Sequence, residues 1–220
     1  MPLKNRVAPD GTLHAVSDRG MFTGNRGVIH DPVTRTGNGK RWTTHSWITC
    51  TCEWKGRRRD VWGYQNGPGR AGWSELFFLD EVTALAAGHR PCFFCRRKNA
   101  NAFSAGFANG NKDCDGRAPS MDRILHRERR LSAKVAPKSI DADEILQLPD
   151  GTMLEREGTF FAFKAGTLLP WRFSGYEQAL ELRALIEKTS DERFFVVTPK
   201  STIAALEAGY VPVWHDSAKS

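Results

Sequence analysis

The chain has 220 residues, of which 40% are hydrophobic and 26% charged, with 13 Phe and 7 Trp among them. This composition supports a buried core and excludes disorder over the whole length. No stretch approaches the roughly 18 consecutive apolar residues of a membrane helix. The basic N-terminus is not followed by the apolar run of a secretory signal. We therefore expect a soluble, cytoplasmic protein that has no membrane partner.

The formal net charge of +7 is unevenly distributed along the chain. Residues 1–135 carry 23 Lys and Arg against 12 Asp and Glu, whereas residues 136–220 carry 9 against 13. A polarised positive charge of this kind favours a polyanionic partner for the first part of the chain. DNA is the leading candidate.

The predicted elements divide the chain into three parts. Residues 1–41 are expected to form an N-terminal β segment, with tight turns at Pro9–Thr12 and Gly24–Gly27. Residues 42–135 are expected to form a basic module that contains all five cysteines. That module opens with a predicted strand over 42–54, which is rich in aromatic and β-branched residues.

The rest of the module alternates short elements. A buried strand is predicted over 76–79, and Asp80 is a good N-cap for a helix that Gly88 would end. Residues 104–119 are rich in Gly, Asn and Asp, which predicts a mobile loop. A second amphipathic helix is then expected over about 120–131.

The last part, residues 136–220, is predicted to be a C-terminal α+β segment. A β-meander is expected over 153–173 and a helix over 176–188. A strand, a helix and a final strand are expected within 194–214. The whole chain is therefore predicted to be an α+β protein of short mixed strands and helices around the cysteines of the central module.

Four of the five cysteines form two close pairs, Cys50-x-Cys52 and Cys92-x-x-Cys95. In a reducing compartment such pairs indicate a metal rather than disulfides. Thiolates bind zinc strongly, and four of them complete a tetrahedron. The spacing therefore predicts a zinc site made by these four cysteines. The alternatives are buried apolar cysteines or a redox pair.

The stretch Leu79–Arg96, LDEVTALAAGHRPCFFCR, resembles the second half of the zinc module of Ada-type DNA methylation-repair proteins. The whole chain also looks like a bacterial family that has this module at its centre. The resemblance assigns Cys92 and Cys95 to the second ligand pair of that module, and Cys50 and Cys52 to the first. The family places three residues between its first two cysteines, whereas this chain places one.

The resemblance also bears on mechanism. In Ada-type modules the first zinc-bound cysteine accepts a methyl group from a DNA phosphotriester, and Cys50 is the residue that would take this role here. The altered spacing favours a purely structural zinc. If Cys52 turns away, His45, His89 or Cys114 could replace it as the fourth ligand.

Basic runs follow both cysteine pairs, so one ion would gather them on a single surface. Arginine binds phosphate through paired, charge-assisted hydrogen bonds. The residues predicted to bind nucleic acid are Lys55, Arg57, Arg58, Arg59, Arg96, Arg97 and Lys98. Arg127, Arg129 and Arg130 of the later helix are expected to extend this surface.

Two pairs of residues could act as general acids or bases. Asp122 and His126 lie four positions apart on a predicted helix, where a carboxylate can orient an imidazole. The dipeptide His30-Asp31 could belong to a metal-dependent nuclease site. The preferred hypothesis is a zinc-binding, DNA-binding protein in repair or in recognition of damaged or modified DNA. The alternatives are a nuclease or base-processing enzyme with a structural zinc, and a zinc-stabilised protein-interaction module.

Overall fold

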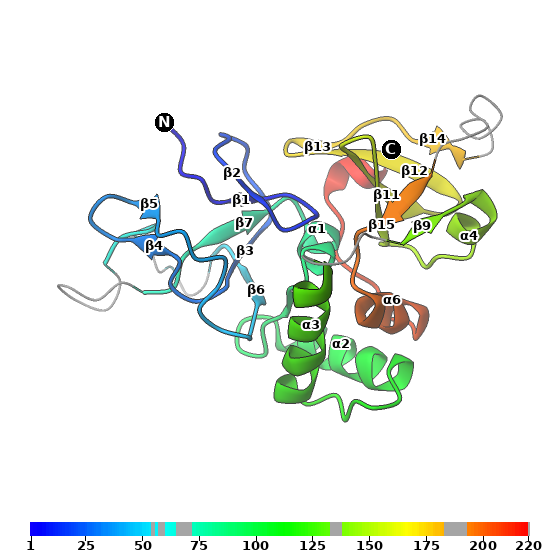
Figure 1. The fold of residues 1–220 in the computed structure, drawn as a ribbon, viewed down its shortest axis with the longest axis horizontal. Helices are drawn as coiled ribbons and strands as arrows, with labels where there is room; N and C mark the ends of the chain where they lie inside the picture. The colour runs from blue at the N-terminus through cyan, green and yellow to red at the C-terminus, as the bar shows by residue number, and fades with distance from the viewer. Residues whose placement is uncertain (54–55, 57–59, 65–71, 133–137, 183–192, 220) are drawn as a thin grey trace.

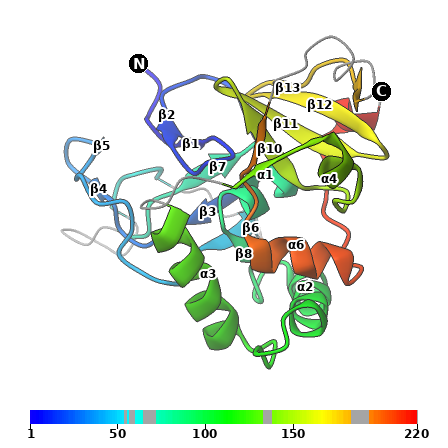
Figure 2. The same ribbon diagram turned by 45° about the vertical axis from the view of Figure 1, so that its right-hand side comes forward.

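The computed structural model describes residues 1–219 apart from 54–55, 57–59, 65–71, 133–137 and 183–192. The described residues form two main β-sheets and several helices, which confirms the predicted α+β class. In Figure 1 the sheet built from the N-terminal residues lies on one side and the C-terminal sheet on the other. Three longer helices lie below and between them, as Figure 2 also shows.

The first sheet has six short strands in the order β2-β1-β7-β3-β6-β8. Its strands are β1 (Arg6–Val7), β2 (Leu13–His14), β3 (Phe22–Asn25), β6 (Ile48–Thr51), β7 (Leu76–Phe78) and β8 (Arg90–Pro91). The predicted strand over 42–54 is therefore only four residues long. A separate hairpin pairs β4 (His30–Asp31) with β5 (Thr36–Gly37). The first sheet therefore combines strands from the predicted N-terminal segment, 1–41, with strands from the predicted module, 42–135.

The second sheet contains the predicted β-meander. Its strands follow the order β13-β12-β11-β10-β15-β9, and β14 pairs with β12. They are β9 (Ser139–Ile140), β10 (Met153–Arg156), β11 (Thr159–Lys164), β12 (Thr167–Arg172), β13 (Gly175–Tyr176), β14 (Leu180–Glu181) and β15 (Phe194–Val196). Alternate residues of β10, β11 and β12 face two different apolar clusters, since successive side chains of a strand point to opposite faces.

Six helices accompany the sheets within the described residues. They are α1 (Glu81–Ala86), α2 (Arg97–Gly110), α3 (Ala118–Ser132), α4 (Ala142–Leu146), α6 (Lys200–Glu207) and the 3₁₀ helix η1 (Asp216–Lys219). None of the helices in the described part of the chain is long and apolar enough to span a bilayer.

Helix α1 lies at the centre of the molecule, and all six of its residues are buried. Val82 packs against the meander, Leu85 against α2, α3 and α6, and Ala84 against the first sheet. The predicted N-cap is confirmed, because Asp80 accepts a hydrogen bond from the Thr83 amide. Gly88 follows the helix with φ of +81°, where a Cβ would also lie 2.9 Å from Arg129 Cδ.

The predicted mobile loop over 104–119 is wrong for its first part, because α2 continues to Gly110. The glycines that suggested a loop have a packing role instead. A Cβ at Gly106 would lie 2.9 Å from the Ala205 carbonyl oxygen, and one at Gly110 would collide with the carbonyl of Ala204. The glycines therefore allow α6 to approach α2 closely.

Two further expectations for the C-terminal part differ from the structure. The helix predicted from residue 176 is replaced by β13 and β14, and its residues 183–188 lie outside the described ones. The final strand expected over 211–214 is an irregular segment. That segment forms a hydrogen bond with the start of α1 and does not pair with a sheet edge. The Glu81 amide donates to the Val213 carbonyl at 3.1 Å.

Asp80 joins α1 to the C-terminal sheet through a buried hydrogen-bond network. Its carboxylate accepts from both the amide and the hydroxyl of Thr83, from the Tyr176 hydroxyl at 2.8 Å and from the His215 amide at 3.1 Å. Burial raises the pKa of Asp80, while these hydrogen bonds act in the opposite direction. Trp171 extends the network by donating to the Thr83 hydroxyl.

The network predicts unequal effects of two substitutions on stability. Asp80→Ala leaves several buried donors without an acceptor and should lower the free energy of unfolding by about 3 kcal/mol or more. Tyr176→Phe removes one hydrogen bond and should cost about 1 kcal/mol. Asp216→Ala, at an exposed acid, serves as the control and should change stability little. Urea denaturation measures all three, and equal losses for the first two variants would contradict the network.

Candidate metal centre

The parallel pairing of β6 with β8 brings Cys50 next to Cys92. Thr49 lies opposite Pro91 in this register, so each cysteine is the next residue along its own strand direction. The Cys92 amide donates to the Thr49 carbonyl at 2.9 Å and fixes the alignment. The chain then turns, and the Arg96 amide donates back to the Cys92 carbonyl at 3.0 Å. This turn places Cys95 beside Cys50 and Cys92.

The ligand atoms of Cys50, Cys92 and Cys95 all lie within 4.8 Å of one another. Sulfurs bound to one tetrahedral zinc, each about 2.3 Å from the ion, are roughly 3.8 Å apart. The three thiols therefore fit a single metal ion. Cys50 and Cys92 are buried and Cys95 is partly exposed. Among the described residues no fourth His, Cys, Asp or Glu joins the group.

The local hydrogen bonds favour a thiolate at Cys92. The Phe94 amide donates to Cys92 Sγ at 3.4 Å. Hydrogen bonds from Cys50 and Cys95 lower the pKa of Cys92. The pKa of Cys50 is raised in turn, because its thiol donates to the same cluster and is buried. Crowded thiols of this kind give up protons when a cation binds.

The structure does not bring Cys52 into this group. Strand β6 ends at Thr51, so the strand alternation that would keep Cys52 on the face of Cys50 stops one residue earlier. Cys52 is exposed, and its Sγ lies 3.4 Å from the Met21 carbonyl oxygen. The other three residues considered as fourth ligands also have different surroundings.

Each of those three residues has contacts of its own away from the cysteine group. His89 is fully buried and accepts a hydrogen bond from Arg26 at 3.3 Å. His45 stacks on His126 with ring centroids 3.7 Å apart. Cys114 belongs to the apolar cluster around α2 and α6.

A buried ion pair lies directly behind the cysteine turn. Arg96, which follows Cys95, pairs with Glu81 at 2.9 Å, and both side chains are almost completely buried. The Arg96 guanidinium also lies 4.2 Å from the ring centroid of Phe22. Glu81 accepts in addition from the Tyr210 hydroxyl at 2.7 Å and the Val213 amide at 2.9 Å. Arg96 is therefore a structural residue here and does not belong to a phosphate-binding surface.

The other predicted basic residues divide into three sets. Lys55, Arg57, Arg58 and Arg59 lie outside the described residues. Arg97 and Lys98 are exposed in the first turn of α2, directly after the cysteine turn. Arg127 and Arg130 are exposed on α3, whereas Arg129 is buried and donates to the carbonyls of Gly88 and His45.

One exposed arginine of α3 is absent from the predicted set. Arg123 lies on α3 four residues before Arg127 and seven before Arg130, so the three share one face of the helix. We call them the α3 arginine stripe. Their helical spacing is visible in the sequence and could have identified them.

Asp122 has a structural partner in place of a catalytic histidine. Arg90 Nε and Nη2 each donate to a carboxylate oxygen of Asp122 at 2.8 Å, and the Ser46 hydroxyl adds a third bond at 2.6 Å. His126 stacks on His45 and meets Trp42 edge to face. Its Nδ1 is buried with no hydrogen-bond partner among the described residues. The predicted carboxylate–imidazole pair is therefore not assembled.

His30 and Asp31 likewise have separate local roles. His30 is buried, stacks on Trp62 and contacts the Ser74 hydroxyl through Nδ1 at 2.5 Å. Burial lowers the pKa of His30. Asp31 accepts from the amides of Val33 and Thr34 and so closes the turn of the β4–β5 hairpin. Within the described part of the chain neither residue joins a metal-ligand group.

Comparisons with protein-family models, with curated proteins and with solved structures find no match to this chain.

The geometry predicts which cysteines bind metal. Replacing Cys50, Cys92 or Cys95 with Ser should reduce the zinc content of the purified protein severalfold, because each removes one thiolate of a shared site. Cys52→Ser is the matched control and should retain the metal. Elemental analysis after gel filtration measures the stoichiometry. Loss of zinc in Cys52→Ser equal to that in Cys92→Ser would place Cys52 in the site.

The Arg90–Asp122 pair predicts a stability defect. Asp122→Ala leaves the buried Arg90 guanidinium without its carboxylate and should cost about 3–5 kcal/mol of unfolding free energy. His126→Ala, one helical turn away, should cost clearly less, because it removes ring contacts with His45 and Trp42 but leaves no buried charge without its partner. Thermal and urea unfolding compare the two. A stable Asp122→Ala protein would contradict the structural role.

Proposed function

We propose that this chain is a zinc-binding protein that binds DNA, and that the zinc is structural. The observation that carries the proposal is the convergence of three thiols from β6 and the turn after β8. Zinc is the first-row ion most often held by a thiolate-rich site of this kind. In the proposed role the ion joins Cys50 of the first sheet to Cys92 and Cys95, and so fixes the start of α2 against that sheet.

The basic surface next to this site supports DNA as the partner. Arg97 and Lys98 are exposed immediately after Cys95, and the α3 arginine stripe presents three further guanidinium groups. Residues 1–135 hold a large excess of basic residues over acidic ones. Exposed arginines aligned on one helix face suit successive backbone phosphates.

The resemblance of residues 79–96 to the Ada-type zinc module connects the proposal to DNA repair. In this proposal Cys92 and Cys95 act as zinc ligands, as the corresponding pair does in that module. The altered first pair, with Cys52 turned away, favours a structural ion over a methyl-accepting cysteine.

The α3 arginine stripe provides the test. The triple variant Arg123→Gln, Arg127→Gln, Arg130→Gln should weaken binding to a DNA duplex. It should also lower the slope of log affinity against log salt by roughly 2–3, since each phosphate contact contributes about 0.9. Fluorescence anisotropy at several salt concentrations measures both quantities.

A matched control changes the net charge by the same amount elsewhere. Lys138→Gln, Arg172→Gln, Lys219→Gln removes three exposed cations near the C-terminal sheet. This variant should keep most of the affinity and the salt slope. Equal losses in both triple variants would mean that only overall charge matters, and the absence of duplex binding by the parent protein would exclude DNA as the partner.

A further inference from the structure

Two cavities adjoin where the loop Asp10–Thr12 of the first sheet approaches the C-terminal sheet. The first has a volume of about 600 Å³ and the second about 530 Å³. Both are lined by Asp10, Thr12 and Arg41, and no cysteine lines either one. Cavities of this size are in the range that small-molecule ligands occupy. The site is therefore distinct from the metal centre.

The second cavity is strongly cationic. Its charged lining residues are Lys4, Arg26, Lys40 and Arg41, opposed by the single carboxylate of Asp10. Gly11 marks the place where two of these guanidinium groups come together. A Cβ built there would lie 3.3 Å from Arg26 Nη2 and 3.8 Å from Arg41 Nη2.

Arg26 is the unusual member of this group, because it is a buried cation without an ion-pair partner among the described residues. It is 1% exposed, and its guanidinium lies 4.1 Å from the ring centroid of Trp47. Nη1 donates to the Gly11 carbonyl and Nε to His89, while Nη2 is buried with no hydrogen-bond partner in the described structure.

The neighbouring charges make this arrangement costly for the protein alone. Burial, and then the proximity of Arg41 and Arg129, lower the pKa of Arg26 to about 9, and the Asp10 carboxylate opposes this shift only in part. Arg129 itself lies 4.2 Å from the Trp47 ring centroid. A buried charge is stabilised by a counter-charge close to it. An anion bound beside Arg26 and Arg41 would supply that counter-charge.

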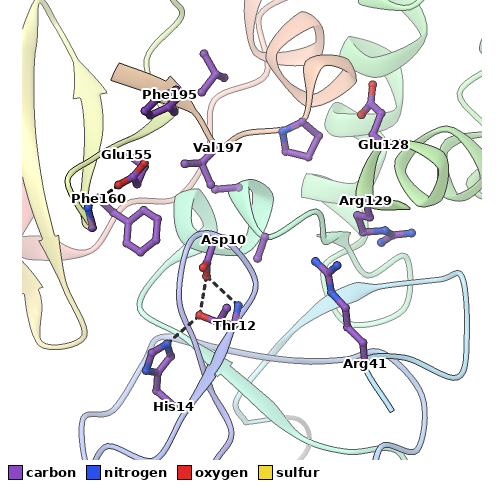
Figure 3. A pocket seen from close by; sticks show the side chains of 15 residues that line it. Asp10, Thr12, His14, Arg41, Glu128, Arg129, Glu155, Phe160, Phe195 and Val197 are labelled. Carbon is purple, nitrogen blue, oxygen red and sulfur yellow. Dashed lines mark hydrogen bonds between the residues drawn. The ribbon is translucent and has the colours of Figure 1, made fainter. Parts of the chain in front are cut away.

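The first cavity offers a different lining. Figure 3 shows Arg41 and Arg129 on one side of it, with Phe160, Phe195 and Val197 on the other. The carboxylates of Asp10, Glu128 and Glu155 also line the cavity and can accept hydrogen bonds. An apolar wall, a few polar groups and an adjoining cationic end suit a flat heterocyclic ring that carries an anionic group.

We propose that the two cavities form a binding site for a nucleotide carrying a terminal phosphate. Arg41 and Lys40 hold the phosphate from the solvent side, and Arg26 provides the fixed charge beneath it. The ring packs against Phe160, Phe195 and Val197. The same chemistry is offered by a free nucleoside monophosphate and by the phosphorylated end of a DNA strand. This site depends on neither the zinc nor the α3 arginine stripe.

Isothermal titration of the full-length protein with deoxyadenosine monophosphate tests the site, with inorganic phosphate and deoxyadenosine as partial probes. The nucleotide should bind more tightly than either probe. Arg41→Gln should weaken nucleotide binding at least tenfold, whereas Arg172→Gln, at an exposed arginine outside the cavities, should leave it unchanged. Phe195→Ala should weaken binding of the nucleotide but not of phosphate.

Competition separates the two sources of the ligand. A 5′-phosphorylated hexanucleotide that displaces the monophosphate assigns the site to a strand end, and failure to displace it assigns the site to a free nucleotide. The triple variant of the α3 arginine stripe should bind the monophosphate normally, so this result is independent of duplex binding. No detectable binding at millimolar nucleotide, or equal binding by Arg41→Gln, would overturn the proposal.

Discussion

The architecture depends on a short helix that has no exposed side. A surface helix buries one apolar stripe, but α1 packs on the first sheet, the meander and the α2–α6 pair at the same time. It therefore brings two acidic residues, Asp80 and Glu81, into the interior, where both are completely buried. Buried carboxylates are tolerated only when donors surround them. The positions of those donors determine how the surrounding layers are connected.

The two carboxylates point to different partners. Asp80 binds Tyr176 and the His215 amide, which holds the C-terminal sheet and tail against the helix. Glu81 binds Tyr210, the Val213 amide and Arg96. Since Arg96 directly follows Cys95, the same helix also positions the cysteine turn. The candidate metal centre is thus supported by a charged pair that lies inside the core, and this pair is linked to residues more than a hundred positions later in the chain.

Capping and turn residues predicted those features whose partners lie within a few residues in the sequence. Asp80 as an N-cap, Gly88 as a helix end and the meander follow from capping and turn chemistry within a few residues. The pairing of Cys50 with the Cys92–Cys95 turn was predicted from ligand chemistry. The exclusion of Cys52 was not predictable in the same way, because it depends on where β6 ends.

Long-range packing explains the remaining differences. Gly106 and Gly110 resemble loop residues in sequence, yet they are glycines because the α6 backbone lies against them. Tyr176 belongs to a strand since it pairs with Trp171 of the meander. The burial of Arg96 requires Glu81 from another element. The α6 backbone and Glu81 lie too far along the chain from their partners for a periodic pattern to reveal them, whereas Trp171 is only five residues from Tyr176.

The distinction between total charge and surface charge follows from the same contacts. Arg90 and Arg96 belong to the basic part of the chain, but each is buried against a carboxylate, so neither adds to an external field. The exposed cations of α2 and α3 are among those in the described part of the chain that face solvent. Arg26 fits neither class, because it is buried like Arg90 yet has no ion-pair partner among the described residues. Its guanidinium contacts an aromatic ring, a carbonyl and an imidazole, and the charges near it are those of Arg41, Arg129 and Asp10. A folded protein rarely keeps such a charge uncompensated, and in this molecule the compensating group is best supplied by a ligand.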